Sequence, residues 1–108
     1  LDYDYHNPGT GANSATWTFG SLPSGQYQVF AKWSPFSNRA SNAPYTVLDG
    51  ATPLATVAID QRNAPTGDQS NGITWQSLGT FAVSTGTMRV RLTDNANGFV
   101  IADAVRVR

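Results

Sequence analysis

The sequence predicts an all-β protein with the fold of an antiparallel jelly-roll-like β-sandwich. Two observations indicate this class. Apolar and polar side chains alternate with a period of two in several short segments, and clusters of Gly, Pro, Asn and Ser separate these segments at regular spacing. In addition, no stretch of about 12 residues keeps the 3.6-residue period of an amphipathic helix. The 108 residues are expected to form a single domain over residues 1–108.

Four strands are expected in the first half of the chain. Their ranges are residues 15–19, 26–33, 44–49 and 54–60. In the first, alanine, tryptophan and phenylalanine alternate with threonine, and Gly20 ends the run. The third and fourth flank Gly50, which predicts a hairpin. Residues 34–43, ahead of this hairpin, carry a proline and two asparagines and are expected to be irregular.

Three further strands are expected in the second half. Their ranges are residues 73–83, residues 87–93 and a last strand that ends at Arg108. Residues 61–72 are polar and contain Pro65 and Gly67, so they are expected to form a loop. The turn signal of residues 95–98 opens the last strand, where Val105 and Val107 alternate with arginines.

The inward positions of these strands define the predicted core. Its members are large apolar residues that share parity within their strands: Trp17, Tyr27, Val29, Trp33, Val47, Val57, Phe81, Val90, Leu92 and Val105.

Asp103 is the exception to this pattern. Counting back by twos from Val105 places it inward, where a carboxylate is costly unless it is paired. The predicted partner is Arg39, because a guanidinium can bind a carboxylate through two parallel hydrogen bonds. The pair would be a structural clamp between the irregular 34–43 segment and the last strand. The alternative is a β-bulge that turns Asp103 out to solvent.

Composition limits the partners. Charged residues make up 13% of the chain and the net charge is zero, so nucleic acid and anionic membranes are not expected to bind. There is no cysteine, which excludes disulfides and thiolate metal sites. No apolar run approaches the roughly 18 residues of a membrane-spanning helix. The low charge, the absence of glutamate and the single lysine suit a secreted bacterial protein, so an extracellular or cell-surface location is expected.

Catalytic patterns are nearly absent, and we expect no enzyme and no catalytic residue. The single histidine is His6, and no Gly-x-Ser-x-Gly or phosphate-binding glycine loop occurs. The aspartates at strand ends and in loops are interpreted as turn caps; they are Asp49, Asp60, Asp68 and Asp94. A calcium site through Asp94, Asn95 and Asn97 lacks the usual density of carboxylates, so no cofactor or metal is expected.

Four aromatic residues are candidates for ligand binding: Tyr3, Tyr5, Phe36 and Trp75. Exposed rings with polar neighbours can stack on sugars or contact a protein partner. Phe30 also faces away from the core set of its own strand. The alternative is that Phe30 and Trp75 cover the second face of a sheet beneath a loop.

Several segments together carry a family resemblance. They are residues 15–19, 22–27, 37–45, 75–81 and 101–106, which cover the chain in order. They resemble the golvesin C-terminal-like domain, also called xanthan-lyase carbohydrate-binding-like. The resemblance implies a jelly-roll β-sandwich that serves as a non-catalytic module in large secreted or surface proteins of bacteria. The carbohydrate-binding-like description refers to the fold, so a sugar ligand is an analogy.

One departure from the family leads to two competing hypotheses. Family members carry a further N-terminal segment with a first strand, and this sequence begins at Leu1 without it. A sandwich lacking that strand would have an open sheet edge near residues 15–19 or near the last strand. The favoured function is an extracellular module that binds a glycan or a neighbouring domain. The alternative is a structural subunit that forms a homo-oligomer or filament by β-strand addition.

Overall fold

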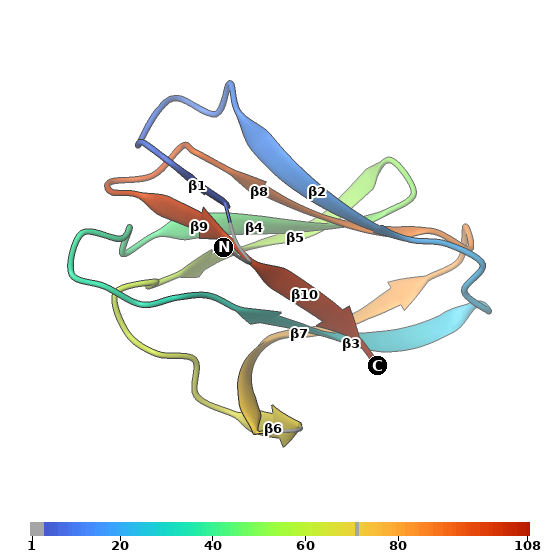
Figure 1. The fold of residues 1–108 in the computed structure, drawn as a ribbon. Helices are drawn as coiled ribbons and strands as arrows, with labels where there is room; N and C mark the ends of the chain where they lie inside the picture. Colours follow the sequence, from blue (N-terminus) through green and yellow to red (C-terminus); the bar gives the residue numbers. More distant parts are fainter. Residues whose placement is uncertain (1–3, 71) are drawn as a thin grey trace.

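The computed structural model describes residues 4–70 and 72–108, which form two antiparallel sheets packed face to face (Figure 1). The strands are β1 (Asp4–His6), β2 (Ser14–Phe19), β3 (Gly25–Lys32), β4 (Ala43–Asp49), β5 (Thr52–Ile59), β6 (Asp68–Ser70), β7 (Ile73–Val83), β8 (Met88–Thr93), β9 (Val100–Ala102) and β10 (Ala104–Val107). The expected sandwich and the absence of helix in the described residues agree with the sequence analysis.

The two sheets have four strands each. One has the order β2-β8-β4-β5 and the other the order β10-β3-β7-β6, while β1 pairs with β9 beside them. In Figure 1 the first sheet forms the upper layer and the second the lower layer. The predicted hairpin is the β4–β5 pair, and Gly50 at its turn has a φ of 61°, a conformation that glycine adopts without strain.

The core lies between the layers and contains every residue predicted for it. The inward side chains of the central strands are fully buried, such as Val29, Val47 and Val90, each with 0% of its surface exposed. Those nearer the edges, such as Trp17 and Val105, are half-buried and pack against the same cluster. Alternation with a period of two is therefore a reliable guide to the core of this chain.

Four features differ from the expected strands. Asp68–Ser70 form a short strand β6 inside the segment expected to be a loop, and Asp4–His6 form β1. The last strand is divided at Asp103 into β9 and β10, which pair with different partners. The β3–β7 register shifts between the Val29–Gly79 and Phe30–Ser77 pairs, so β7 contains a bulge at Leu78.

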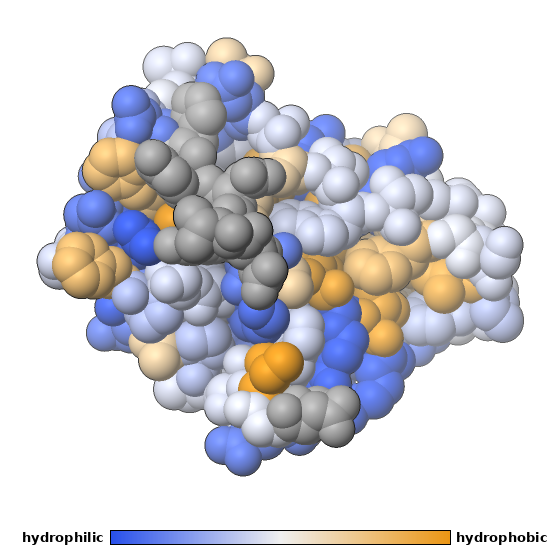
Figure 2. Space-filling model, in the orientation of Figure 1, coloured by the Kyte–Doolittle hydropathy of each residue, from blue (hydrophilic) through white to orange (hydrophobic). Residues whose placement is uncertain are grey.

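Two edge strands, β2 and β10, bound the sheets on the side that faces the viewer in Figure 1. Figure 2 shows a mostly polar surface in this orientation, with hydrophobic residues gathered between β2 and β10. The inward residues of both edge strands are half-buried, among them Phe19 and Val107. The core is therefore less completely covered along this side than at the centre of the sheets.

Candidate binding surface at the loop end

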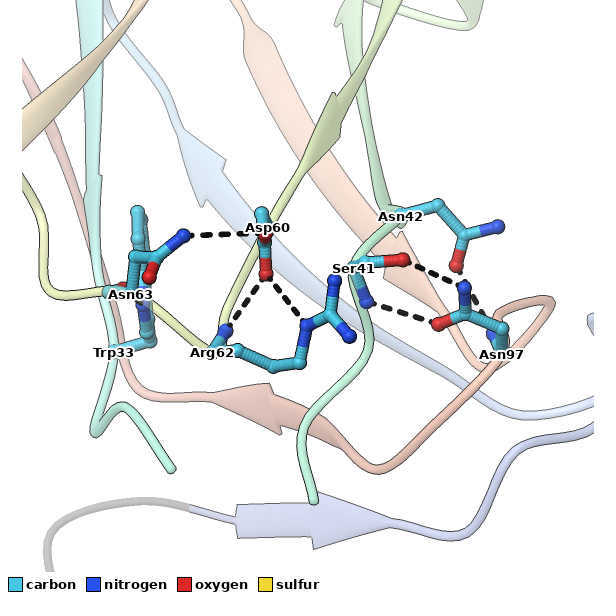
Figure 3. Close-up of polar contacts among 7 residues, drawn as sticks. All are labelled: Trp33, Ser41, Asn42, Asp60, Arg62, Asn63 and Asn97. Carbon is cyan, nitrogen blue, oxygen red and sulfur yellow. Dashed lines mark hydrogen bonds and ion pairs between the residues drawn. The ribbon is translucent and has the colours of Figure 1, made fainter. Parts of the chain in front are cut away.

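Three loops are joined by hydrogen bonds at one end of the sandwich, which we call the loop end: residues 33–42, 60–67 and 94–99. Asn97 bonds Ser41 twice, accepting from its amide at 2.9 Å and donating to its hydroxyl at 2.6 Å. Its own amide donates to Asn42 Oδ1 at 3.0 Å. Trp33 Nε1 donates to the Asn63 carbonyl at 2.7 Å. Figure 3 shows the Asn97 side chain facing Ser41 and Asn42. The loop end is therefore a cross-linked surface that can hold side chains in fixed positions.

Gln61 lies buried beneath these loops, with 0% of its surface exposed. Its Oε1 accepts from the Ile101 amide at 2.8 Å, and its Nε2 donates to the Ile101 carbonyl at 2.9 Å. The same Nε2 donates to the Tyr45 hydroxyl at 3.0 Å. The Gln61 side-chain amide thus makes the two hydrogen bonds to the Ile101 backbone that a neighbouring strand would otherwise make. Burial raises the pKa of the Tyr45 hydroxyl well above its usual value, so this group stays protonated.

Phe36 is the most exposed large hydrophobic residue at the loop end, with 61% of its surface exposed. It opens a turn in which the Arg39 amide donates to the Phe36 carbonyl at 3.2 Å. The Arg39 guanidinium lies 5.7 Å from the centre of the Phe36 ring and donates to the Ser34 carbonyl and to Asn38 Oδ1. Phe36 is therefore presented to solvent by a hydrogen-bonded turn.

The same turn is anchored to the strand that follows residue 99. The Ala40 amide donates to the Phe99 carbonyl at 2.7 Å, and the Phe99 amide donates to the Asn38 carbonyl at 3.1 Å. Arg39 and Phe99 form a parallel β-bridge. The loop 33–42 is therefore tied to the final part of the chain by its backbone.

The predicted clamp between Arg39 and Asp103 is wrong. Asp103 lies in the break between β9 and β10, and its Oδ2 accepts from Lys32 Nζ at 2.8 Å. Arg39 instead holds its own loop through Ser34 and Asn38. The side chain of Asp103 is only 12% exposed, so the solvent-facing alternative is wrong too. Lys32 pairs with Ala104 across β3 and β10, and Asp103 directly precedes Ala104, so the Lys32 ammonium lies within reach of the Asp103 carboxylate.

Double-mutant cycles should show whether Lys32 or Arg39 is the partner of Asp103. Lys32→Met and Asp103→Asn are expected to show a coupling energy of about 1 kcal/mol, since the pair is only partly buried. Arg39→Met and Asp103→Asn should instead show additive losses. Urea unfolding of the single and double variants measures both couplings, and a larger coupling for the Arg39 cycle would contradict the pairing seen here.

The predicted turn-capping role of the aspartates is confirmed for Asp49 and Asp60. Asp49 accepts from the amides and hydroxyls of Ser84 and Thr85, and Asp60 accepts from Arg62 and Asn63. The Thr85 hydroxyl bond lowers the pKa of Asp49, and the Arg62 side-chain bond lowers that of Asp60. Both carboxylates therefore favour the ionised form in the folded protein.

These two pKa shifts predict a loss of stability in acid. A carboxyl group whose folded pKa is depressed contributes stability above its unfolded pKa, and this stability is lost as the pH falls through the folded value. The thermal midpoint should therefore decrease below about pH 3.8, the ordinary value for aspartate. In Asp49→Asn the decrease should be shallower; an identical pH profile would show that Asp49 does not contribute.

Two of the three residues of the calcium hypothesis have side-chain partners within the protein. Asp94 is buried, and its carboxylate accepts from the Gly11 amide at 2.8 Å and from Asn13 Nδ2 at 3.1 Å. The Asn97 side chain binds Ser41, and Asn95 is exposed. Over residues 4–70 and 72–108 no group of three or more His, Cys, Asp or Glu side chains is placed to hold a metal ion. Asp94 serves as a cap that orders the loop before β2.

Two of the four candidate aromatic residues, Phe36 and Trp75, can be placed, and they have different neighbours. Tyr3 lies outside the described residues, and Tyr5 belongs to β1, where only the backbone is described. Phe36 stands at the loop end, whereas Trp75 lies on β7 and contacts Arg106.

Within the described parts of the chain, no helix has the length and apolar character needed to cross a bilayer.

Comparisons with known proteins agree with this fold. The model of the golvesin C-terminal domain family matches residues 1–108. A solved structure of a xanthan lyase from Paenibacillus is similar over 97% of this chain, with 35% sequence identity and a TM-score of 0.77. The matched region is 10% of that enzyme, so this chain corresponds to a small part of it. A search of curated proteins found no match. The family resemblance and the predicted fold class are confirmed.

Proposed function

This chain belongs to the golvesin C-terminal domain family. On this basis we propose that it is a non-catalytic binding module of a larger extracellular bacterial protein. Its ligand is a glycan or a neighbouring protein domain. The matched structure is an enzyme of which this fold is a small part, which supports an accessory role. The carboxylates of Asp49, Asp60 and Asp94 are engaged as turn caps, which supports binding in place of catalysis.

The observation that carries the proposal is the exposed Phe36 ring on its hydrogen-bonded turn. A ring at 61% exposure leaves apolar surface in water, and stacking on a sugar or seating in a partner removes it. Asn38 and Arg39 beside it supply polar groups that fix orientation. Because the turn is already ordered, binding carries a smaller entropic cost.

Binding assays with a matched control test this role. The chain is screened on a glycan array and against xanthan, and the best ligand is titrated by calorimetry. Phe36→Ala should weaken binding by about tenfold or more, as expected for one aromatic anchor. Leu54→Ala removes a hydrophobic residue on β5 that is 40% exposed, and it should bind as the parent does. Equal binding by the parent and Phe36→Ala would contradict a loop-end site.

A second candidate function is self-association through a sheet edge, which the half-buried side between β2 and β10 favours. The Asp94 amide donates to the Asn13 carbonyl, and this fixes which residues of β2 bond to β8. By alternation along the β2–β8 register, the amides of Thr16 and Thr18 point away from β8. Those groups can pair with a strand of another chain.

Light scattering over a range of concentrations tests this candidate. If the parent associates, Thr16→Pro should restore the monomer, because it removes an outward donor at an exposed position. Ala15→Pro is the contrasting variant, since its amide faces Leu92 within the sheet and its loss should destabilise the fold. A parent that stays monomeric at high concentration rules the candidate out.

A further inference from the structure

The four edge strands of the two larger sheets differ in their protection against strand addition. β5 contains Pro53, and its register against β4 shifts after Val47, and both features hinder the addition of a further strand. β6 and β10 have only three and four residues. In contrast, β2 has six residues without a proline or a charged side chain, and its register against β8 is unbroken. The edge of β2 is therefore the most open to pairing with another chain.

The open side of β2 presents backbone hydrogen-bonding groups at alternate residues. Odd-numbered residues bond to β8, because the Asp94 amide donates to the Asn13 carbonyl at 3.1 Å and the alternation continues along the strand. The backbone groups of Ser14, Thr16 and Thr18 therefore point away from β8. Among the described residues β2 pairs with β8 alone, and it borders the upper layer in Figure 1. Each of these outward residues thus offers one donor and one acceptor to an incoming strand.

Both ends of β2 are anchored to neighbouring segments. Before the strand, the Asp94 carboxylate accepts from the Gly11 amide at 2.8 Å and from Asn13 Nδ2 at 3.1 Å. After the strand, the Leu22 amide donates to the Gly86 carbonyl at 3.0 Å. An edge that is ordered in advance loses less conformational entropy when it pairs with a second strand.

We propose that β2 pairs with β2 of a second copy in antiparallel orientation, with the two Thr16 residues facing each other across a twofold axis. Ser14 then faces Thr18 of the second copy, so every outward backbone group of the strand has a partner. Placing Trp17 on the axis would instead set Ser14 against Gly20, which lies outside the strand. Because both copies contribute the same strand, the contact closes as a dimer. This dimer is a specific form of the second candidate function, self-association through a sheet edge, and rests on it.

The same register matches the side chains on both faces of β2. On the outer face, the serine and threonine hydroxyl groups of the two copies lie side by side, and such pairs stabilise neighbouring strands. On the inner face, Ala15 lies opposite Trp17 of the second copy as a non-hydrogen-bonded pair, with Cα atoms about 4.5 Å apart. Trp17 stacks on Tyr45 with 6.5 Å between ring centres but is only half-buried, so this contact removes further apolar surface from water. The strand carries no charged side chain, so the contact between identical strands brings no like charges together.

Crosslinking through single cysteines tests this pairing, because the sequence has no cysteine of its own. In the dimer the two Thr16 Cα atoms would lie about 5.5 Å apart, within the range of a disulfide, so Thr16→Cys should crosslink on mild oxidation. Thr18→Cys is the matched control, an exposed threonine of the same strand and face. Its two copies would lie about 13 Å apart along the strand direction. Thr16→Cys should therefore crosslink at least about tenfold faster than Thr18→Cys on a non-reducing gel, because only its sulfurs come within bonding range.

Light scattering of the parent separates a wrong register from an absence of association. A parent that stays monomeric at high concentration would overturn both this dimer and the second candidate function. Association of the parent with equal crosslinking of the two cysteine variants would overturn the β2 pairing alone, and so would growth beyond a dimer. Phe36→Ala should associate as the parent does, because the loop end takes no part in the contact. Thermal unfolding establishes that each variant is folded.

Discussion

Replacing Gln61 with methionine is expected to lower the free energy of unfolding by about 3–5 kcal/mol, because it leaves buried polar groups without partners. The groups are the amide and carbonyl of Ile101 and the hydroxyl of Tyr45. Methionine keeps the volume of glutamine, so the loss reports hydrogen bonding with little contribution from a cavity. Urea unfolding measures it, and hydrogen exchange at the Ile101 amide locates it.

Two further variants sharpen this result. Gln69→Met alters an exposed glutamine on β6 and should change stability by no more than about 0.5 kcal/mol. Tyr45→Phe removes one of the orphaned groups, so Gln61→Met and Tyr45→Phe together should cost less than the sum of the single changes. Additive losses, with Ile101 still protected from exchange, would show that the Gln61 side chain does not bridge these strands.

The sequence predicts the layers and the core of this protein well because both depend on a simple period. Alternation in segments such as 15–19 and 87–93 specifies which side chains turn inward, and burial of apolar surface enforces that choice. The hairpin at Gly50 follows from local turn chemistry. These features need no knowledge of which strands are neighbours.

Features that depend on strand order are not predicted. The sequence shows that Asp103 needs a partner, but Lys32 is placed beside it only by the β3–β10 pairing. Gln61 is predicted to belong to a polar loop, because nothing in its local sequence indicates that Ile101 will lie beside its side chain. The bulge at Leu78 has one local signal, Gly79, although a glycine alone does not specify where parity changes.

The aromatic candidates show the same division. Phe36 is predicted to be exposed because Pro35 and its polar neighbours belong to a loop, and the structure agrees. Phe30 is predicted to face away from the core, and its ring is nonetheless buried. Its cover is supplied by arginines from the far end of the chain, a contact that requires β10 to pair with β3. The burial of Phe30 therefore becomes visible only in the folded protein.

The second large effect is expected at Gly98, in the turn before β9. A Cβ atom there would lie 2.8 Å from the Arg39 carbonyl oxygen and 3.0 Å from the Ala40 amide nitrogen, so Gly98→Ala must move backbone. Such overpacking costs about 1–3 kcal/mol. Since Ala40 and Asn38 bond to Phe99, the displaced segment is the one that carries Phe36. The variant should therefore be less stable and should also bind loop-end ligands more weakly.

Gly20→Ala is the matched control, because a Cβ at that position meets nothing within 4 Å. Chemical denaturation of the two variants gives the stability difference, and hydrogen exchange at the Ala40 amide reports whether the bridge to Phe99 has opened. In Gly98→Ala this amide should exchange faster than in Gly20→Ala. Unchanged protection at Ala40 together with parental stability would mean that the loop yields without strain. The close approach at Gly98 would then not be what holds the Phe36 turn in place.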